Sequence, residues 1–174
     1  MEKEEVSIAD CGRVKSMITC KFKSGYESFL RHVASAAVVV RNNEILMIKR
    51  ASKLHEDPGK YGLPGGFVDL DERVFESVLR ELKEETGYTG KLKKLFWIND
   101  DPGRRNQVVD FVYLVEVKET NNVFDHEVES IHWFDLNNLP SKEKIAFDHA
   151  KIIKLYKKWR EEKFSLPIIG KDKK

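Results

Sequence analysis

The chain has 174 residues, 41% of them hydrophobic and 34% charged, and its 31 Lys and Arg against 29 Asp and Glu give a net charge of +2. These values indicate one globular domain with a substantial core and exclude a disordered chain. The longest apolar stretch, Ala36–Val40, is far too short to span a membrane, and so small a net charge gives no argument for nucleic-acid binding.

The ends of the chain and its cysteines bear on location. The acidic start, Met-Glu-Lys-Glu-Glu, has no apolar run behind it and is unlike a signal peptide. Cys11 and Cys20 are too few for a four-cysteine zinc site, so we interpret them as free thiols. We therefore expect a cytoplasmic protein, with residues 164–174 as a basic, solvated C-terminal tail.

The first half of the chain predicts strands and loops. Residues 1–33 contain a β-like patch at Val14–Phe22 and predict an N-terminal extension of one or two strands. Ser35–Val40 is an apolar run that suits a central buried strand, and turn residues lead from it to a second strand at Ile45–Ile48. Residues 49–66, rich in Pro and Gly, predict mostly loop.

Helical spacing begins at Arg73 and continues to Glu85, where Val74, Val78 and Leu82 recur at four-residue steps and Gly87 provides the stop. After it we expect three strands and an amphipathic helix, at Lys91–Ile98, Val108–Val117, Glu129–Phe134 and Ile145–Trp159. Strands between two long helices predict an α/β domain over residues 34–163, with a mixed sheet covered on both faces.

Three carboxylates of the first helix, Glu81, Glu84 and Glu85, share an arc of about 100° when each residue turns by about 100°. Glu81 and Glu85 lie on the shoulder of the apolar stripe, where like charges and partial burial are both unfavourable. A divalent cation removes both penalties, and a set of hard oxygen ligands favours Mg²⁺ or Mn²⁺ over zinc. Glu76 and Lys83 fall on the opposite, solvated face.

On its own this pattern fits a solvated charged helix face equally well. The preceding segment, Leu63-Pro64-Gly65-Gly66, favours a metal site, because backbone without a Cβ can approach an ion or a phosphate closely. Glu72 lies at the turn from loop to helix. Arg80 lies beside Glu84, where it can orient a carboxylate or form a surface ion pair.

The spacing of these residues matches a known motif. Gly66, Glu72, Arg80, Glu81, Glu84, Glu85 and Gly87 fit the Nudix box, Gly-x5-Glu-x7-Arg-Glu-U-x-Glu-Glu-x-Gly-U, at every fixed position, with Leu82 and Tyr88 in the apolar slots. From about Ala34 to Lys154 the chain therefore resembles the Nudix hydrolase family. This resemblance implies an α/β/α sandwich with a central mixed β-sheet.

The resemblance also implies a chemistry. Glu81, Glu84 and Glu85 would bind Mg²⁺ (or Mn²⁺), with help from Glu72 and the main-chain carbonyl near Gly65, and Arg80 would orient the glutamates. Such ions neutralise a diphosphate and lower the pKa of an attacking water. The general base in the family is either a box glutamate or one on a later loop, for which Glu127 is the candidate; a plain surface acid is an equal alternative there.

Substrate recognition depends on residues outside the box. Asp101-Pro102-Gly103-Arg104-Arg105 and Ala146-Phe147-Asp148-His149-Ala150 resemble segments of ADP-ribose pyrophosphatases. Arg50, Arg104 and Arg105 are candidates to bind phosphate. Four aromatic residues are candidates to stack on a base, although core packing suits the last two better: Phe22, Tyr26, Trp97 and Phe111.

The expected function is Mg²⁺-dependent hydrolysis of ADP-ribose to AMP and ribose 5-phosphate. One alternative is a house-cleaning pyrophosphatase for nucleoside triphosphates such as 8-oxo-dGTP, and another is a nucleotide-sensing regulator. RNA decapping ranks last, because no strongly basic or aromatic-rich segment supports it. We expect a small nucleotide as partner, and the N-terminal strands are a hypothetical site of homodimer formation.

Overall fold

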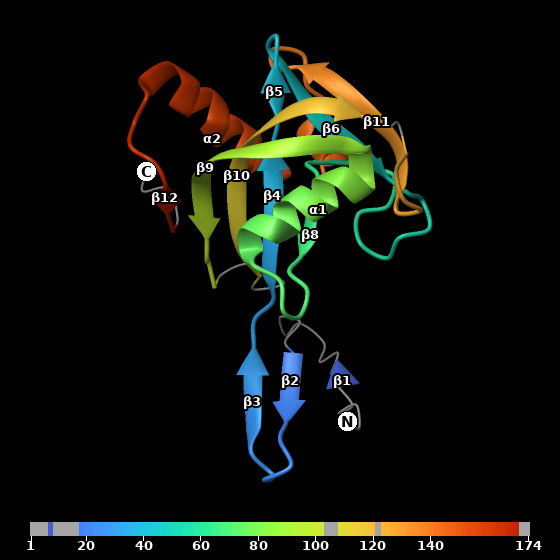
Figure 1. Cartoon of the computed structure of the whole chain (residues 1–174), viewed down its shortest axis with the longest axis vertical. Helices are drawn as coiled ribbons and strands as arrows, with labels where there is room; N and C mark the ends of the chain where they lie inside the picture. The colour runs from blue at the N-terminus through green and yellow to red at the C-terminus, as the bar shows by residue number, and fades with distance from the viewer. Residues whose placement is uncertain (1–6, 9–17, 103–107, 121–122, 171–174) are drawn as a thin grey trace.

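The computed structural model describes residues 7–8, 18–102, 108–120 and 123–170. In this part of the chain two β-sheets form the centre of the body, and one helix packs on each side of them (Figure 1). This arrangement is the expected α/β class with a mixed sheet between helices. No helix among these residues is long and apolar enough to cross a membrane.

The larger sheet has the strand order β12-β9-β10-β4-β8. Its strands are β4 (Val33–Val38), β8 (Gly65–Phe67), β9 (Tyr88–Asn99), β10 (Val109–Thr120) and β12 (Ile168–Ile169). The sheet is mixed because β10 runs parallel to β4 and antiparallel to β9. The second sheet has the order β11-β6-β5 with β7 also paired to β6, and consists of β5 (Val40–Arg41), β6 (Glu44–Arg50), β7 (Tyr61–Gly62) and β11 (Val128–Asp135).

Strand β4 separates two apolar cores. Successive side chains of a strand point to opposite faces, so Ala36 and Val38 face one helix while Ala37 faces the other. The first core contains side chains of helix α2 (His149–Glu162), and the second contains side chains of helix α1 (Val74–Thr86). This burial on both faces explains why the sequence of β4 is apolar at every position except Ser35.

Helix α1 begins and ends as the sequence predicts. Arg73 is the N-cap, and Gly87 ends the helix with φ 69°, a left-handed conformation that glycine adopts without strain. The Gly87 N–H donates to the carbonyl of Lys83 at 2.8 Å. On the inner side, the buried hydroxyls of Ser77 and Ser35 hydrogen bond at 2.9 Å and hold α1 against β4.

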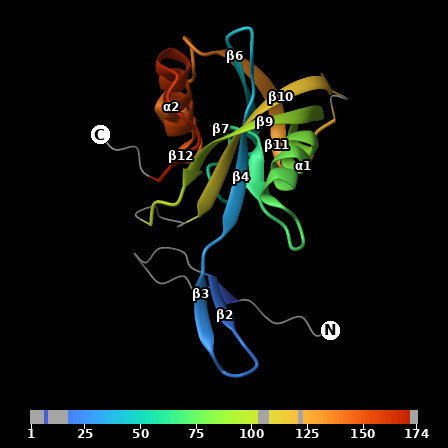
Figure 2. The same ribbon diagram turned by 60° about the vertical axis from the view of Figure 1, so that its left-hand side comes forward.

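The N-terminal part forms a separate antiparallel sheet of three strands instead of one or two: β1 (Ser7–Ile8), β2 (Ile18–Lys21) and β3 (Glu27–Leu30). Residues 9–17, which include the start of the predicted patch Val14–Phe22, lie outside the described residues. Strand β3 leads directly into β4, and the small sheet projects from the body (Figure 2). At its base, the Arg31 side chain donates to the Asp100 carbonyl at 2.9 Å.

The last helix was predicted to start at Ile145 but starts at His149, after a short 3-10 turn at Lys142–Lys144. Ile145 instead forms a parallel bridge with Tyr61, and the Ala146 N–H donates to the Tyr61 carbonyl at 2.7 Å. Ile145 still contributes to the core that α2 faces, which is why its spacing suggested a helix. The loop predicted at 49–66 likewise contains β7 and the start of β8, because both strands pair across the chain.

The C-terminal segment is tied to the body at least as far as Gly170. Strand β12 pairs in parallel with β9, and Phe164, Leu166 and Ile168 pack against the core of α2. The Trp97 indole N–H donates to the Gly170 carbonyl at 2.9 Å. The described part of the expected tail, residues 164–170, is therefore a packed strap in which half-buried residues alternate with exposed ones.

Candidate active site

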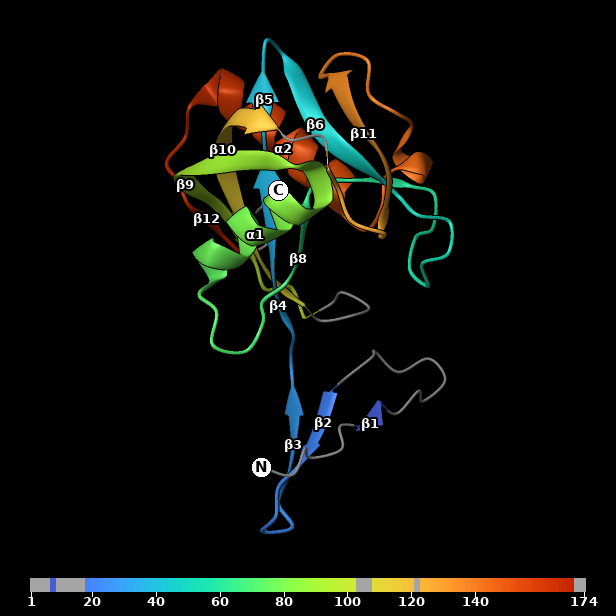
Figure 3. The same cartoon turned by 45° about the vertical axis from the view of Figure 1, so that its right-hand side comes forward.

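The C-terminal end of α1 lies beside two loops that come from distant parts of the sequence, residues 51–60 and 123–127 (Figure 3). The Asp125 N–H donates to the Glu84 carbonyl at 2.9 Å, which joins the second loop to the end of the helix. The Ala51 N–H donates to the Glu127 carbonyl at 2.8 Å, which joins the two loops. The carboxylates of α1 therefore face a rim formed by loops.

Arg80 connects most of the predicted carboxylates. Its Nε and Nη2 donate to the two oxygens of Glu72 at 2.8 and 3.0 Å. Its Nη1 donates to Glu81 at 2.9 Å and to Glu84 at 3.0 Å, and Nη2 also donates to the Phe67 carbonyl at 3.2 Å. These acidic partners, Glu72 above all, raise the pKa of Arg80. Arg80 thus holds three carboxylates at once, as an orienting arginine must.

Glu85 is the most deeply buried acid of the group, with 4% of its surface exposed. The Gly65 N–H donates to its Oε2 at 2.8 Å. Burial raises the pKa of Glu85 well above its usual value, and burial also raises the pKa of Glu81 in spite of the hydrogen bond from Arg80. Two neighbouring carboxyl groups are therefore costly to ionise in this place, and a cation beside them would offset that cost.

The two glycines before the helix are required for different reasons. A Cβ on Gly65 would lie 2.1 Å from the Ser35 carbonyl oxygen and 2.7 Å from the Ala36 Cα, both backbone atoms of β4. A Cβ on Gly66 would lie 2.4 Å from Oε1 of Glu81. Gly65 thus permits the close antiparallel pairing of β8 with β4, whereas Gly66 gives space to a carboxylate of the site.

Two other predicted residues lie near the carboxylates. Arg50 is half-buried at the end of β6, and its charge lowers the pKa of Glu85, although burial outweighs it. Glu127 is exposed on its loop, and its charge contributes to the raised pKa of Glu81. Both side chains therefore lie within electrostatic reach of the cluster.

The remaining candidates are elsewhere. Arg104 and Arg105 lie outside the described residues. Of the four aromatic candidates, Trp97 is fully buried in the core and Phe111 packs against the core of α1. Phe22 and Tyr26 lie in the turn between β2 and β3, with their tilted rings 5.7 Å apart. Core packing of Trp97 and Phe111 agrees with the sequence analysis, and none of the four is a residue of the carboxylate cluster.

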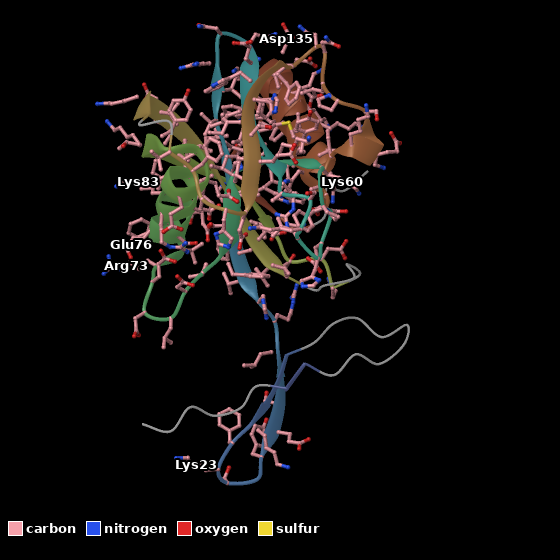
Figure 4. All side chains as sticks on the ribbon, turned by 90° about the vertical axis from the view of Figure 1, so that its right-hand side faces the viewer. Lys23, Lys60, Arg73, Glu76, Lys83 and Asp135 are labelled. Carbon is pink, nitrogen blue, oxygen red and sulfur yellow. The ribbon has the colours of Figure 1, made fainter. Side chains whose placement is uncertain are left out.

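The outer side of α1 carries residues that the cluster does not include. Figure 4 shows Arg73, Glu76 and Lys83 on the outer side of the helix, pointing away from the sheets. The Glu76 carboxylate accepts from the Arg73 N–H at 3.1 Å and so caps the first turn. The prediction that Glu76 and Lys83 lie on a solvated face is confirmed, since both are exposed.

Sequence reasoning missed two residues beside the cluster, Asp125 and Phe147. The charge of Asp125 contributes to the raised pKa of Glu85, and the ring of Phe147 lies 4.9 Å from the guanidinium carbon of Arg50. For Phe147 the sequence does carry a signal, because the segment 146–150 resembles a segment of ADP-ribose pyrophosphatases. Its placement depends on pairing with residues far away in sequence, which no local pattern reveals.

The donor set suits a hard divalent cation. Glu72, Glu81, Glu84 and Glu85 supply only oxygen atoms. The first three carboxyl groups pair with the guanidinium of Arg80, and the fourth, that of Glu85, is buried beside them. With the side chains facing Arg80, no three acidic, histidine or cysteine groups of the described chain are gathered around one point.

Comparison with known proteins places the whole region in context. A family model described as the NUDIX domain matches residues 30–156. An ADP-ribose pyrophosphatase of Methanocaldococcus jannaschii is 42% identical over 130 residues, which cover 74% of this chain and 74% of that protein.

Solved structures agree on the fold. A NUDIX hydrolase from Nitrosomonas europaea has a TM-score of 0.68 at 21% identity and covers 95% of this chain and 93% of its own. A bifunctional NMN adenylyltransferase/ADP ribose pyrophosphatase from Francisella tularensis, complexed with AMP and a Mn ion, has a TM-score of 0.56 at 25% identity; the match covers 74% of this chain and 42% of that one.

Proposed function

Because the chain belongs to the Nudix hydrolase family and is a pyrophosphohydrolase of small nucleotide substrates, we propose that it hydrolyses ADP-ribose to AMP and ribose 5-phosphate with Mg²⁺. The observation that carries the substrate is the 42% identity to an ADP-ribose pyrophosphatase across three quarters of both chains. Members of this family use divalent metals, and the Francisella tularensis neighbour is described with a Mn ion. The choice of Mg²⁺ rests on the all-oxygen donor set.

We assign roles to the residues of the carboxylate cluster. Glu81, Glu84 and Glu85 hold the metal, with Glu72 and the Gly65 carbonyl as further ligands. A metal held by these residues would neutralise the diphosphate and lower the pKa of the attacking water. Arg80 keeps the glutamates in position, a role supported by its hydrogen bonds to three of the four carboxylates.

Arg50 and Glu127 complete the proposed machinery from the loop side. Arg50 binds a phosphate of the substrate, which is supported by its electrostatic reach to Glu85. Glu127 accepts the proton of the attacking water, which is supported by its exposure and its electrostatic reach to Glu81. We also propose that the protein is a homodimer that forms through the N-terminal sheet, where Phe22, Tyr26 and Leu30 are exposed.

The test is a hydrolysis screen of the purified protein with Mg²⁺ on ADP-ribose, NADH, diadenosine polyphosphates and 8-oxo-dGTP. We expect selective release of AMP and ribose 5-phosphate from ADP-ribose. Glu84→Gln and Glu85→Gln should each lower turnover by about three orders of magnitude or more, since each removes a metal ligand or base. Glu76→Gln is the matched control, because Glu76 lies on the outer side of the same helix and Gln preserves the capping bond.

Three outcomes separate the alternatives. A preference for 8-oxo-dGTP would keep the chemistry and discard ADP-ribose. Absence of turnover on every compound would favour the nucleotide-sensing alternative. Glutamine variants as active as the Glu76→Gln control would contradict the assignment of the site.

A further inference from the structure

Phe147 has an unusual conformation for a large apolar residue. Its φ is 54°, in the left-handed region that side chains with a Cβ disfavour, and 44% of its surface is exposed. The Phe147 N–H donates to Oδ2 of Asp57 at 2.7 Å, and Asp57 also pairs with Lys60 at 2.7 Å. Lys60, labelled in Figure 4, marks the loop that supplies this support. The surrounding residues thus hold a strained, outward-facing ring, which is a feature of binding sites.

The ring of Phe147 is supported by polar neighbours instead of an apolar core. The Arg50 guanidinium carbon lies 4.9 Å from the ring centre, and the His149 ring meets it edge-on at 5.4 Å. Arg50 is itself fixed, because its Nε and Nη2 donate to the Glu56 carbonyl at 3.2 and 3.1 Å. A cation over the ring and a second ring inclined to it orient Phe147, and 44% of its surface stays exposed.

The segment that carries Phe147 is joined to the loop before the carboxylate helix. The Ala146 N–H donates to the Tyr61 carbonyl at 2.7 Å, and His149 Nδ1 accepts from the Leu63 N–H at 2.8 Å. Two residues beyond Leu63, the Gly65 N–H donates to Glu85. Phe147 is therefore positioned against the same stretch of backbone that positions Glu85, on the side of Arg50.

We infer that Phe147 is the platform on which the nucleobase of the substrate stacks, beside Arg50, which takes the adjoining phosphate. A nucleoside 5′-phosphate carries its base and its phosphate at opposite ends of the ribose, so a neighbouring exposed ring and guanidinium match its two ends. Every base has a flat π-face that an aromatic side chain can cover. Phe147 is in this sense a residue that determines the preference for nucleotides over sugar phosphates, and the inference rests on the proposed function.

The kinetic test compares Phe147→Ala, Phe147→Leu and Phe147→Trp with the wild type on ADP-ribose. Loss of a base stack should raise KM about tenfold or more and leave kcat within about threefold, because stacking acts equally on substrate and transition state. Phe147→Leu keeps an apolar side chain but lacks the π-face, so it should resemble Phe147→Ala. Phe147→Trp keeps an aromatic π-face, so its KM should stay close to the wild-type value. A merely structural role predicts instead that kcat falls and that Trp does not rescue it.

The matched control is Phe75→Ala. Phe75 is 39% exposed and also lies beside an arginine, with the Arg73 guanidinium carbon 5.8 Å from its ring centre. Its neighbours in sequence, Arg73 and Glu76, lie on the outer side of α1 (Figure 4). Loss of the Phe75 ring should change neither KM nor kcat.

A binding measurement separates this inference from the proposed reaction. Calorimetric titration with AMP and with ribose 5-phosphate tests the base directly, because only AMP has one. We expect Phe147→Ala to weaken AMP binding about tenfold and to leave ribose 5-phosphate unchanged. Equal AMP affinity in the variant and the wild type would overturn the role of Phe147. If the wild type does not hydrolyse ADP-ribose, the proposed substrate is wrong. The AMP titration would still decide whether the Phe147 ring binds the base.

Discussion

At the residue scale, the site concentrates acidic groups in a place where ionisation is unfavourable. Glu85 is almost fully buried and receives one backbone hydrogen bond, while Arg80 is occupied by three other carboxylates. A cluster of this kind lowers the stability of the folded chain, because an uncompensated buried charge is unfavourable, but it can bind a cation. The proposed ion is what makes the arrangement favourable in the working enzyme.

The pH dependence of stability should report this cost in the presence of a chelator. Because the pKa of Glu85 is raised on folding, the unfolded chain ionises first as pH rises. Wild-type stability should therefore fall, relative to Glu85→Gln, from about pH 4.3, the unfolded value, until pH passes the folded pKa. Below about pH 4.3 the difference between the two proteins should be constant.

Urea unfolding of both proteins in EDTA at several pH values measures this difference. Glu76→Gln, which changes an exposed glutamate of the same helix, should show no such trend. A gap between wild type and Glu85→Gln that does not change with pH would mean that Glu85 is not ionised at a cost in the folded state.

At the element scale, the pairing of β8 with β4 brings the loop backbone to the helix. The N–H of Gly65 reaches Glu85 because β8 pairs with β4, and α1 packs on the same strand. The geometry of the site thus depends on one strand pairing. Substitution of the two adjacent glycines can separate its two functions, which are close backbone contact at Gly65 and space for Glu81 at Gly66.

We expect Gly65→Ala and Gly66→Ala to have different effects. The Cβ that Gly65→Ala introduces would meet backbone atoms of β4, so this variant should lose about 1–3 kcal/mol of stability or fail to fold. The Cβ that Gly66→Ala introduces would meet the end of a flexible side chain, so this variant should fold normally but lose activity as Glu81 is displaced. Urea unfolding and turnover of ADP-ribose measure the two effects; similar losses of stability in both variants would contradict the distinction.

At the scale of the whole molecule, the N-terminal sheet lacks a core of its own within the described residues. Its strands are two to four residues long, and Phe22, Tyr26 and Leu30 are each more than two-fifths exposed. Small sheets of this kind are stable when an apolar face is covered. A second copy of the chain is the covering partner that we propose.

Light scattering after size exclusion should therefore give about 41 kDa, twice the chain mass of 20.3 kDa. A double substitution, Phe22→Ser with Tyr26→Ser, should shift the mass toward one chain because it removes exposed apolar surface from the sheet. A wild-type mass of one chain at micromolar concentration would contradict the proposed dimer. The cytoplasmic location expected from the sequence stays a prediction.

Local sequence determined a large part of the fold and of the candidate site. Helix α1, its stop at Gly87 and the shared face of its glutamates follow from residue spacing, because a helix repeats with a fixed period. The strands β4, β6, β9, β10 and β11 follow from apolar runs between turns, with ends displaced by up to a few residues. Residue types and spacing also predicted a divalent-cation site, and the resemblance to the Nudix box indicated a pyrophosphohydrolase.

Only the tertiary structure decided how these parts meet. Three features depend on contacts between residues that local periodicity does not relate. They are the hydrogen bonds from Arg80 to Glu72, the burial of Glu85 and the position of Phe147 beside Arg50. The segment 145–148 has helical spacing, yet it pairs with Tyr61, because hydrogen bonds across the fold outweigh a weak local preference. Sequence by itself predicted the candidate reactive groups, and the packing of distant segments decided their burial and their partners.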